Sequence, residues 1–195
     1  MSESVFLLPR PLLFSLLAVF ALVMLLHVSQ LPLWMFLVAG GICIWRINIL
    51  REVWRAPSLW FKTLLVCVTT ALLYVEYAQW FALEPMLTLL LLSLTLKLIE
   101  LRSERDIVFL ICLSYFAIAC SFLFEQSVLH TLLALLAVVV TTATLLQVYS
   151  RLFPFSQIIR LACKILLQSA VLAGVMLLVL PRLSGLFLYS QIRRR

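Results

Sequence analysis

Charged residues are scarce in this sequence. They make up 12% of its 195 residues, while hydrophobic residues make up 65%. A water-soluble domain of this length has too little interior to hide so much apolar surface, which excludes an ordinary soluble fold. The chain also has only four glycines, and no linker rich in glycine, proline or serine divides it. We therefore treat it as one unit whose main solvent is lipid.

The side chains that usually carry out chemistry are also few. The chain has two histidines, His27 and His130, and no CxxC pair among its five cysteines. It contains no HExxH, no glycine-rich phosphate motif and no Cys/His cluster. We therefore expect no catalytic, cofactor-binding or metal site. The cysteines lie in or beside apolar runs, and we interpret them as small core residues. They are Cys43, Cys67, Cys112, Cys120 and Cys163.

Long apolar runs are what the sequence has instead. A helix needs roughly 20 apolar residues to cross a bilayer, and about 17 to 25 are tolerated. Seven runs approach this length, although the second and the fourth are short. They cover residues 12–28, 32–45, 61–75, 85–96, 107–124, 129–149 and 165–180. The sequence thus predicts an all-α fold, a polytopic integral membrane helical bundle of about seven transmembrane helices.

The distribution of basic residues predicts how these helices are oriented. Short cytoplasmic loops carry an excess of Lys and Arg. With a cytoplasmic N-terminus, eleven of the fifteen basic residues fall on the cytoplasmic side, and the three loops on the other side hold none. The net charge of +7 therefore indicates membrane topology rather than a face that binds nucleic acid.

The C-terminal tail is the exception to this pattern. After seven spans, Arg182 and the terminal Arg193, Arg194 and Arg195 lie outside. A six-span arrangement places the tail inside, but one well-patterned span must then be dropped. We keep seven spans, with a transmembrane helical domain at 1–181 and a short basic tail at 182–195.

The most distinctive polar string lies between the fourth and fifth runs. It reads LKLIELRSERD at 96–106, and its basic and acidic residues alternate. Their spacing suits contacts along a helix, so we expect the fourth helix to continue through the string. One interpretation is a solvated helix end, and the other is a docking surface for a protein or for neighbouring cytoplasmic segments. The candidate docking residues are Lys97, Glu100, Arg102, Arg105 and Asp106.

A second set of polar residues falls inside the apolar runs. We expect Gln147 and Gln168 to form hydrogen bonds between helices, together with Thr141, Thr142 and Thr144. If these side chains lined one water-filled cavity, the chain would be a small oligomeric transporter or channel subunit. This function is the alternative to a non-catalytic scaffold.

Four short motifs occur in order along the chain: WRAP at 54–57, LKLIELRSERD at 96–106, FLFEQS at 122–127 and LPRLSG at 180–185. In these motifs the sequence resembles the N-terminal membrane domain of TgpA-type bacterial transglutaminase-like proteins. The resemblance implies a multi-pass domain of the bacterial inner membrane that precedes a periplasmic domain with a papain-like Cys-His-Asp triad. That domain would supply the protein-glutamine gamma-glutamyltransferase activity.

This sequence departs from the family's pattern at its C-terminus. It stops at Arg195, about where the periplasmic domain would begin, so no residue matches the triad. We therefore expect no enzyme activity from this chain, and we interpret the tail as the truncated start of an extramembrane region. The expected function is a non-catalytic anchor or scaffold in the cell envelope, without a cofactor. Its expected partners are the lipid bilayer and a periplasmic transglutaminase-like domain or another membrane protein, but no nucleic acid.

Overall fold

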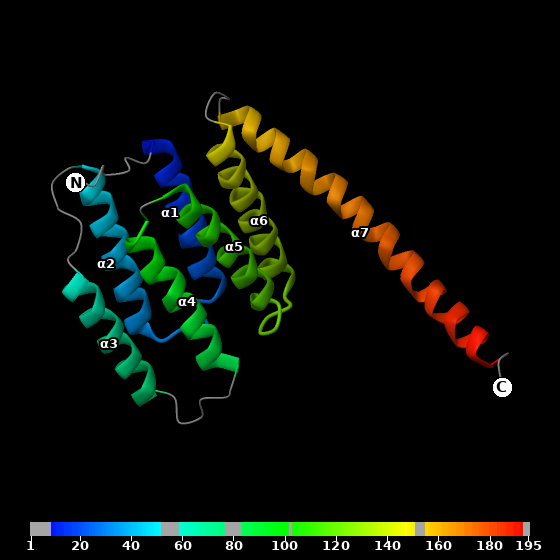
Figure 1. Cartoon of the computed structure of the whole chain (residues 1–195), viewed down its shortest axis with the longest axis horizontal. Helices are drawn as coiled ribbons and strands as arrows, with labels where there is room; N and C mark the ends of the chain where they lie inside the picture. The colour runs from blue at the N-terminus through cyan, green and yellow to red at the C-terminus, as the bar shows by residue number, and fades with distance from the viewer. Residues whose placement is uncertain (1–8, 52–58, 77–82, 102, 151–154, 193–195) are drawn as a thin grey trace. The chain divides into compact units, whose positions relative to one another are not determined.

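Every regular element in the described part of this computed structural model is a helix. The structure describes residues 9–51, 59–76, 83–101, 103–150 and 155–192. These ranges hold seven helices and no strand, which confirms the predicted all-α class. The helices are α1 (Arg10–Leu26), α2 (Leu33–Leu50), α3 (Leu59–Glu76), α4 (Leu83–Ile99), α5 (Glu104–Ser121), α6 (Val128–Tyr149) and α7 (Phe155–Ile192) (Figure 1).

Two of these helices are long and apolar enough to cross a membrane. One is α6, with 22 residues, and the other is the segment Ser156–Met176 of α7. Helix α1 and residues Leu33–Ile49 of α2 are apolar but shorter. The seven helices follow the order of the seven predicted runs. Within the described residues, however, only two of these helices have the length and composition of a full span.

The described residues form two compact units. Helices α1 to α6 belong to the unit 1–151, and α7 forms the unit 152–195. Within the first unit, consecutive helices alternate in direction, so their connections lie at two opposite ends (Figure 1). We call the end with the α4–α5 turn the lysine end, and the end with the α1–α2 and α5–α6 turns the histidine end.

Helices α1 and α4 are the two most buried elements of the first unit, each with nine buried residues out of 17. Helix α1 packs against α2, α5 and α6, while α4 packs against α2, α3 and α5. Leu13, Leu16 and Val23 of α1 are almost completely covered, at spacings that place them on one face. Helices in lipid gain stability mainly from such close packing, because a lipid tail is as apolar as leucine.

Small side chains line the buried face of α6. Ala134, Ala137 and Thr141 are covered at spacings of three and four residues. Helix α6 packs against α1 and α5, so this face meets those two helices. Small residues let helix backbones approach closely, which increases the number of van der Waals contacts.

Most of the hydroxyl groups in α6 bond to their own helix. Thr141 donates to the Ala137 carbonyl at 2.6 Å, and Thr144 donates to the Val140 carbonyl at 2.8 Å. Thr142 also donates within α6, at 2.7 Å to Val138, but it accepts a bond from the Tyr115 hydroxyl of α5 at 2.7 Å. The expectation that these threonines join helices is therefore right only for Thr142, because a nearby carbonyl of the same helix satisfies the other two.

The outer surface of the first unit is apolar as well. On α6 the exposed side chains include Leu129, Leu132, Leu135 and Leu136, and on α3 they include Trp60 and Val75, which are 85% and 83% exposed. Cys67 and Cys112 are exposed too, so interpreting them as core residues is wrong, while Cys43 and Cys120 are half-buried. Cys163 lies on α7, in the second unit. A run that is apolar on both faces does not reveal which face is buried.

The polar string at 96–106 does not continue the fourth helix, which corrects that prediction. Helix α4 ends at Ile99, and α5 begins at Glu104 after its N-cap, Ser103. The Ser103 hydroxyl accepts from the Asp106 amide at 3.3 Å, and Asp106 Oδ2 accepts from the Ser103 amide at 3.1 Å. This reciprocal pair is a capping box, and it starts a new helix in the middle of the string.

Candidate functional site

The candidate docking residues gather at the lysine end, on both sides of the α4–α5 turn. Lys97 lies in the last turn of α4, Glu100 in the turn itself and Asp106 in the first turn of α5. Arg105 is exposed on α5, and Arg102 lies outside the described residues. The turn therefore brings together on two helices the charges that we expected along one.

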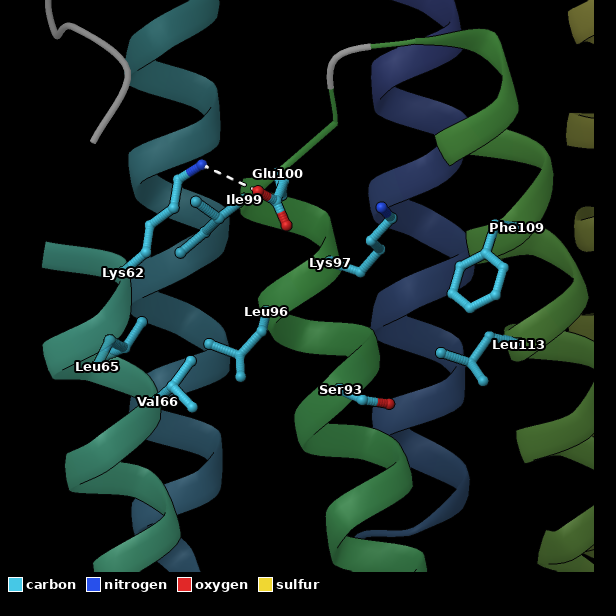
Figure 2. A pocket seen from close by; sticks show the side chains of 10 residues that line it. All are labelled: Lys62, Leu65, Val66, Ser93, Leu96, Lys97, Ile99, Glu100, Phe109 and Leu113. Atoms are coloured by element: carbon cyan, nitrogen blue, oxygen red, sulfur yellow. Dashed lines mark ion pairs between the residues drawn. The ribbon is translucent and has the colours of Figure 1, made fainter. Parts of the chain in front are cut away.

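The ion pairs at this end differ from those expected from helical spacing. Lys97 Nζ lies 2.6 Å from Asp106 Oδ1, and its side chain is 27% exposed. Lys62 Nζ of α3 lies 3.5 Å from Glu100 Oε1, as Figure 2 shows. Partial removal from water strengthens the first pair, whereas Glu100 is half exposed and the second pair is more screened.

Two further contacts connect the lysine end. Arg46 of α2 donates from Nη2 to the Leu101 carbonyl at 3.2 Å, which ties α2 to the α4–α5 turn. The Lys97 ammonium lies 5.7 Å from the centre of the Phe109 ring, within the range of a cation–π contact. The contact of Arg46 agrees with the expectation that the string meets neighbouring cytoplasmic segments, but local spacing does not show which turn Arg46 and Lys62 reach.

An open groove lies beside these charges. It encloses about 340 Å³ between α3, α4 and α5 (Figure 2). Its apolar walls include Leu65, Val66, Leu96, Phe109 and Leu113. Its polar end is formed by Lys62, Lys97 and Glu100. The groove is thus apolar along its length and charged at one end, which suits a ligand that has an apolar part and a charged part.

The opposite end of the first unit holds both histidines. His27 caps α1 and is fully buried, and its Nδ1 lies 2.8 Å from the Val23 carbonyl, to which it donates. Burial lowers the pKa of His27 by disfavouring the imidazolium; the bond to Val23 raises the pKa, and nearby His130 lowers it. The Nε2 atom of His27 is buried without a hydrogen-bond partner among the described residues.

His130 anchors the α5–α6 turn. Its Nε2 lies 3.0 Å from Ser121 Oγ, and its Nδ1 lies 3.7 Å from Glu125 Oε2. This order of groups is that of a serine, histidine and acid triad. However, the Ser121 hydroxyl is buried and donates to the Ile118 carbonyl at 2.7 Å, so it is not presented to a substrate. We interpret the network as a support for the turn, with Ser127 as the N-cap of α6.

The lowered pKa of His27 makes the stability of the first unit depend on pH. The unfolded chain binds this proton more readily than the folded chain, so stability is lost as the pH falls below about 6.5. We expect the melting temperature in detergent to be lower at pH 5 than at pH 7.5. A His27→Gln variant should show a smaller difference between the two values. An unchanged difference would contradict a role for this imidazole.

The two glutamines singled out from the sequence have different surroundings. Gln147 of α6 accepts a 2.7 Å hydrogen bond from the Ser15 hydroxyl of α1, which joins the two helices. Gln168 lies on α7, where its side chain is exposed. Gln147 belongs to the first unit and Gln168 to the second. A bond between helices is therefore observed for Gln147, while the role expected of Gln168 stays a prediction.

Comparison with known proteins places these features in a family. A sequence model for the TgpA N-terminal domain matches residues 15–193. The protein-glutamine gamma-glutamyltransferase of Pseudomonas aeruginosa is 31% identical over 182 residues, which are 92% of this chain but only 27% of that relative. No solved structure matches the chain. Because the family match covers almost the whole sequence, the chain belongs to the TgpA N-terminal domain family.

Proposed function

We propose that this chain is a non-catalytic, membrane-embedded domain that anchors or scaffolds a transglutaminase-like domain outside the bacterial inner membrane. The observation that carries the proposal is the family match over residues 15–193, together with the named activity of the relative. The chain spans only 27% of that relative. We therefore assign the transglutaminase activity to the separate domain that this chain anchors or scaffolds, and not to the chain itself.

The apolar exterior supports a location in lipid. Leu33, Leu37 and Trp60 are each more than three-quarters exposed, although they are large hydrophobic side chains. Monomeric soluble proteins rarely expose large contiguous apolar surfaces. In a bilayer the same surface needs no further cover, because lipid tails surround it.

Charge supports the orientation with the lysine end in the cytoplasm. Arg46, Arg51, Lys62, Lys97 and Arg105 all lie at or near that end. Residues 27–32 and 122–127 at the histidine end contain no Lys or Arg, and the sequence between α3 and α4, 77–82, contains none either. The positive-inside rule then assigns the histidine end to the outer side of the membrane, with the chain starting in the cytoplasm.

The surroundings of the histidines support a non-catalytic role. A papain-like mechanism needs a cysteine thiol beside an imidazole base. Here the imidazole of His27 bonds to the Val23 carbonyl, and that of His130 bonds to Ser121 and faces Glu125. The partners of both imidazoles are thus groups that hold turns in place, and neither bond is made to a cysteine.

Cysteine labelling tests both the membrane location and the orientation. In a chain whose five cysteines are replaced by alanine, Gln126→Cys puts a thiol at the exposed histidine end, and Arg105→Cys puts one at the exposed lysine end. An impermeant maleimide should label Gln126→Cys in intact spheroplasts. It should label Arg105→Cys only after permeabilisation, and both variants should stay in membranes washed with carbonate.

Two results would contradict the proposal. Release of the chain by carbonate would exclude an embedded domain, and labelling of Arg105→Cys in intact spheroplasts would reverse the orientation. Permeabilised spheroplasts serve as the control for thiol reactivity, because both sites must then react.

A further inference from the structure

We propose that the groove between α3, α4 and α5 binds one phospholipid of the ethanolamine class, with an acyl chain along α4 and the headgroup at Lys62, Glu100 and Lys97. The inference rests on the proposed membrane location and adds a specific ligand to it. Figure 2 shows the groove with Lys62 and Phe109 on opposite sides of it.

The groove lies beside α4 from Ser93 to Glu100, and an exposed strip of the same helix continues it, so that groove and strip together have the length of one leaflet. Met86, Leu89 and Ser93 are exposed along α4 at spacings of three and four residues, and Lys97 follows on the same face. From Met86 to Lys97 the helix rises about 16 Å, at about 1.5 Å per residue. Half of a hydrocarbon core of about 30 Å is nearly the same distance. An acyl chain that begins at the lysines would therefore end near the middle of the bilayer.

The floor and walls of the groove suit a hydrocarbon chain. Among the described residues that line the groove below its charged end, Ser93 is the one polar side chain, and its hydroxyl donates to the Leu90 carbonyl at 2.7 Å. This bond leaves the serine hydrogen satisfied within α4. The small size of Ser93 also leaves room between Leu65 and Leu113, which flank it from α3 and α5 (Figure 2).

The charged end of the groove matches a headgroup that carries both signs. An ammonium group has three N–H donors, so Lys62 and Lys97 can each keep a carboxylate partner and still donate to a phosphate. The Glu100 carboxylate is half exposed, and its contact with Lys62 is a long 3.5 Å. It can accept from the primary ammonium of an ethanolamine headgroup with little loss.

Other phospholipids match this end less well. The charges of Lys62, Lys97, Glu100 and Asp106 sum to zero, so these four groups do not favour an anionic headgroup. Arg46 and Arg105 at the same end attract the phosphate that all these lipids share. Phosphatidylglycerol offers no cation to Glu100. Phosphatidylcholine carries a cation without an N–H donor, so it cannot form the hydrogen bond to the carboxylate.

Native mass spectrometry of the full chain tests the headgroup. We supply phosphatidylethanolamine, phosphatidylcholine and phosphatidylglycerol with identical acyl chains, and we compare how much of each stays bound on activation. The wild type should retain phosphatidylethanolamine about two to five times better than either competitor, the range of one exposed charge pair. Glu100→Gln should remove this preference, whereas Glu104→Gln, an exposed residue that does not line the groove, should leave it intact.

A second pair of variants tests the acyl groove. Ser93→Phe fills the floor and should abolish retention of the single lipid, while Thr131→Phe on the exposed face of α6 should not.

Equal retention of the three lipids by the wild type would overturn the proposal, as would equal effects of Glu100→Gln and Glu104→Gln. A lipid-free dimer that Ser93→Phe abolishes would assign the groove to a second copy of the chain instead. Loss of lipid preference in a chain that resists carbonate contradicts this site alone, whereas release by carbonate contradicts the proposed function.

Discussion

Replacing Ala137 with phenylalanine should prevent the first unit from folding in detergent. Ala137 is completely buried on the face of α6 that meets α1 and α5. Even modest overpacking of a filled interior costs typically about 1 to 3 kcal/mol, and an aromatic ring between two close helices must force them apart. Size-exclusion chromatography of a fluorescent fusion should show aggregate in place of the monodisperse peak.

Ala119→Phe provides the matched control for this change. Ala119 lies on the exposed side of α5, so the same ring would point away from the packed helices. We expect its elution profile to equal that of the wild type. If both variants eluted alike, the close approach of α6 to its neighbours would not be what holds the unit together.

Asp106→Ala should give the second largest loss of stability. Its carboxylate accepts from the Ser103 amide at 3.1 Å and lies 2.6 Å from the Lys97 ammonium, so one substitution removes half of the capping box and an ion pair. Loss of the cap and of a partner for a partly buried group costs about 1 to 3 kcal/mol. A fluorescence melt in detergent should show a melting temperature lower by several degrees.

Substitutions at two neighbouring positions provide comparisons for the stability loss of Asp106→Ala. Ser103→Ala removes the N-cap hydroxyl but leaves the pair between Lys97 and Asp106, so it should cost about 0.5 to 2 kcal/mol. Arg105→Ala changes an exposed side chain in the same turn of α5 and should have little effect. If Arg105→Ala were as harmful as Asp106→Ala, the string would act through its overall charge and not through this geometry.

The helical content of the chain could be predicted from the sequence. The start of α5 inside the polar string could have been predicted too, but we did not recognise it. The apolar runs have the length of helices, and each corresponds to one of α1 to α7. Ser103 followed three residues later by Asp106 is the signature of a helix start. Charge spacing along 96–106 suggested a continuous helix instead, because the same residues also satisfy the spacing rule for contacts within a helix.

Other contacts at the lysine end could not be predicted from local spacing. Lys62 and Glu100 are 38 positions apart, and their contact depends on how α3 packs against α4. Arg46 reaches the Leu101 carbonyl, an acceptor that every residue type possesses. Tertiary packing selects such partners, and no periodicity in the sequence encodes them.

The sequence also did not show which face of each helix is buried. In a soluble protein, a polar stripe marks the outer face of a helix. Here Leu135 and Ala137 are near neighbours in an unbroken apolar run, yet one is exposed and the other is fully covered. The same ambiguity explains why the exposed cysteines Cys67 and Cys112 were assigned to the core.

The hydroxyl groups that donate to carbonyls of their own helix have a consequence for the insertion of each helix during synthesis. Thr95, Ser114 and Thr141 each donate to a carbonyl four residues earlier, at 2.6 to 2.8 Å. Their hydrogens are therefore satisfied before any neighbouring helix arrives. In the proposed membrane location, this lowers the cost of releasing each segment singly into lipid during synthesis. Gln147 is different, because its amide oxygen accepts from Ser15. Since α1 is synthesised long before α6, the membrane location that we propose would place this partner in the bilayer before the amide enters it.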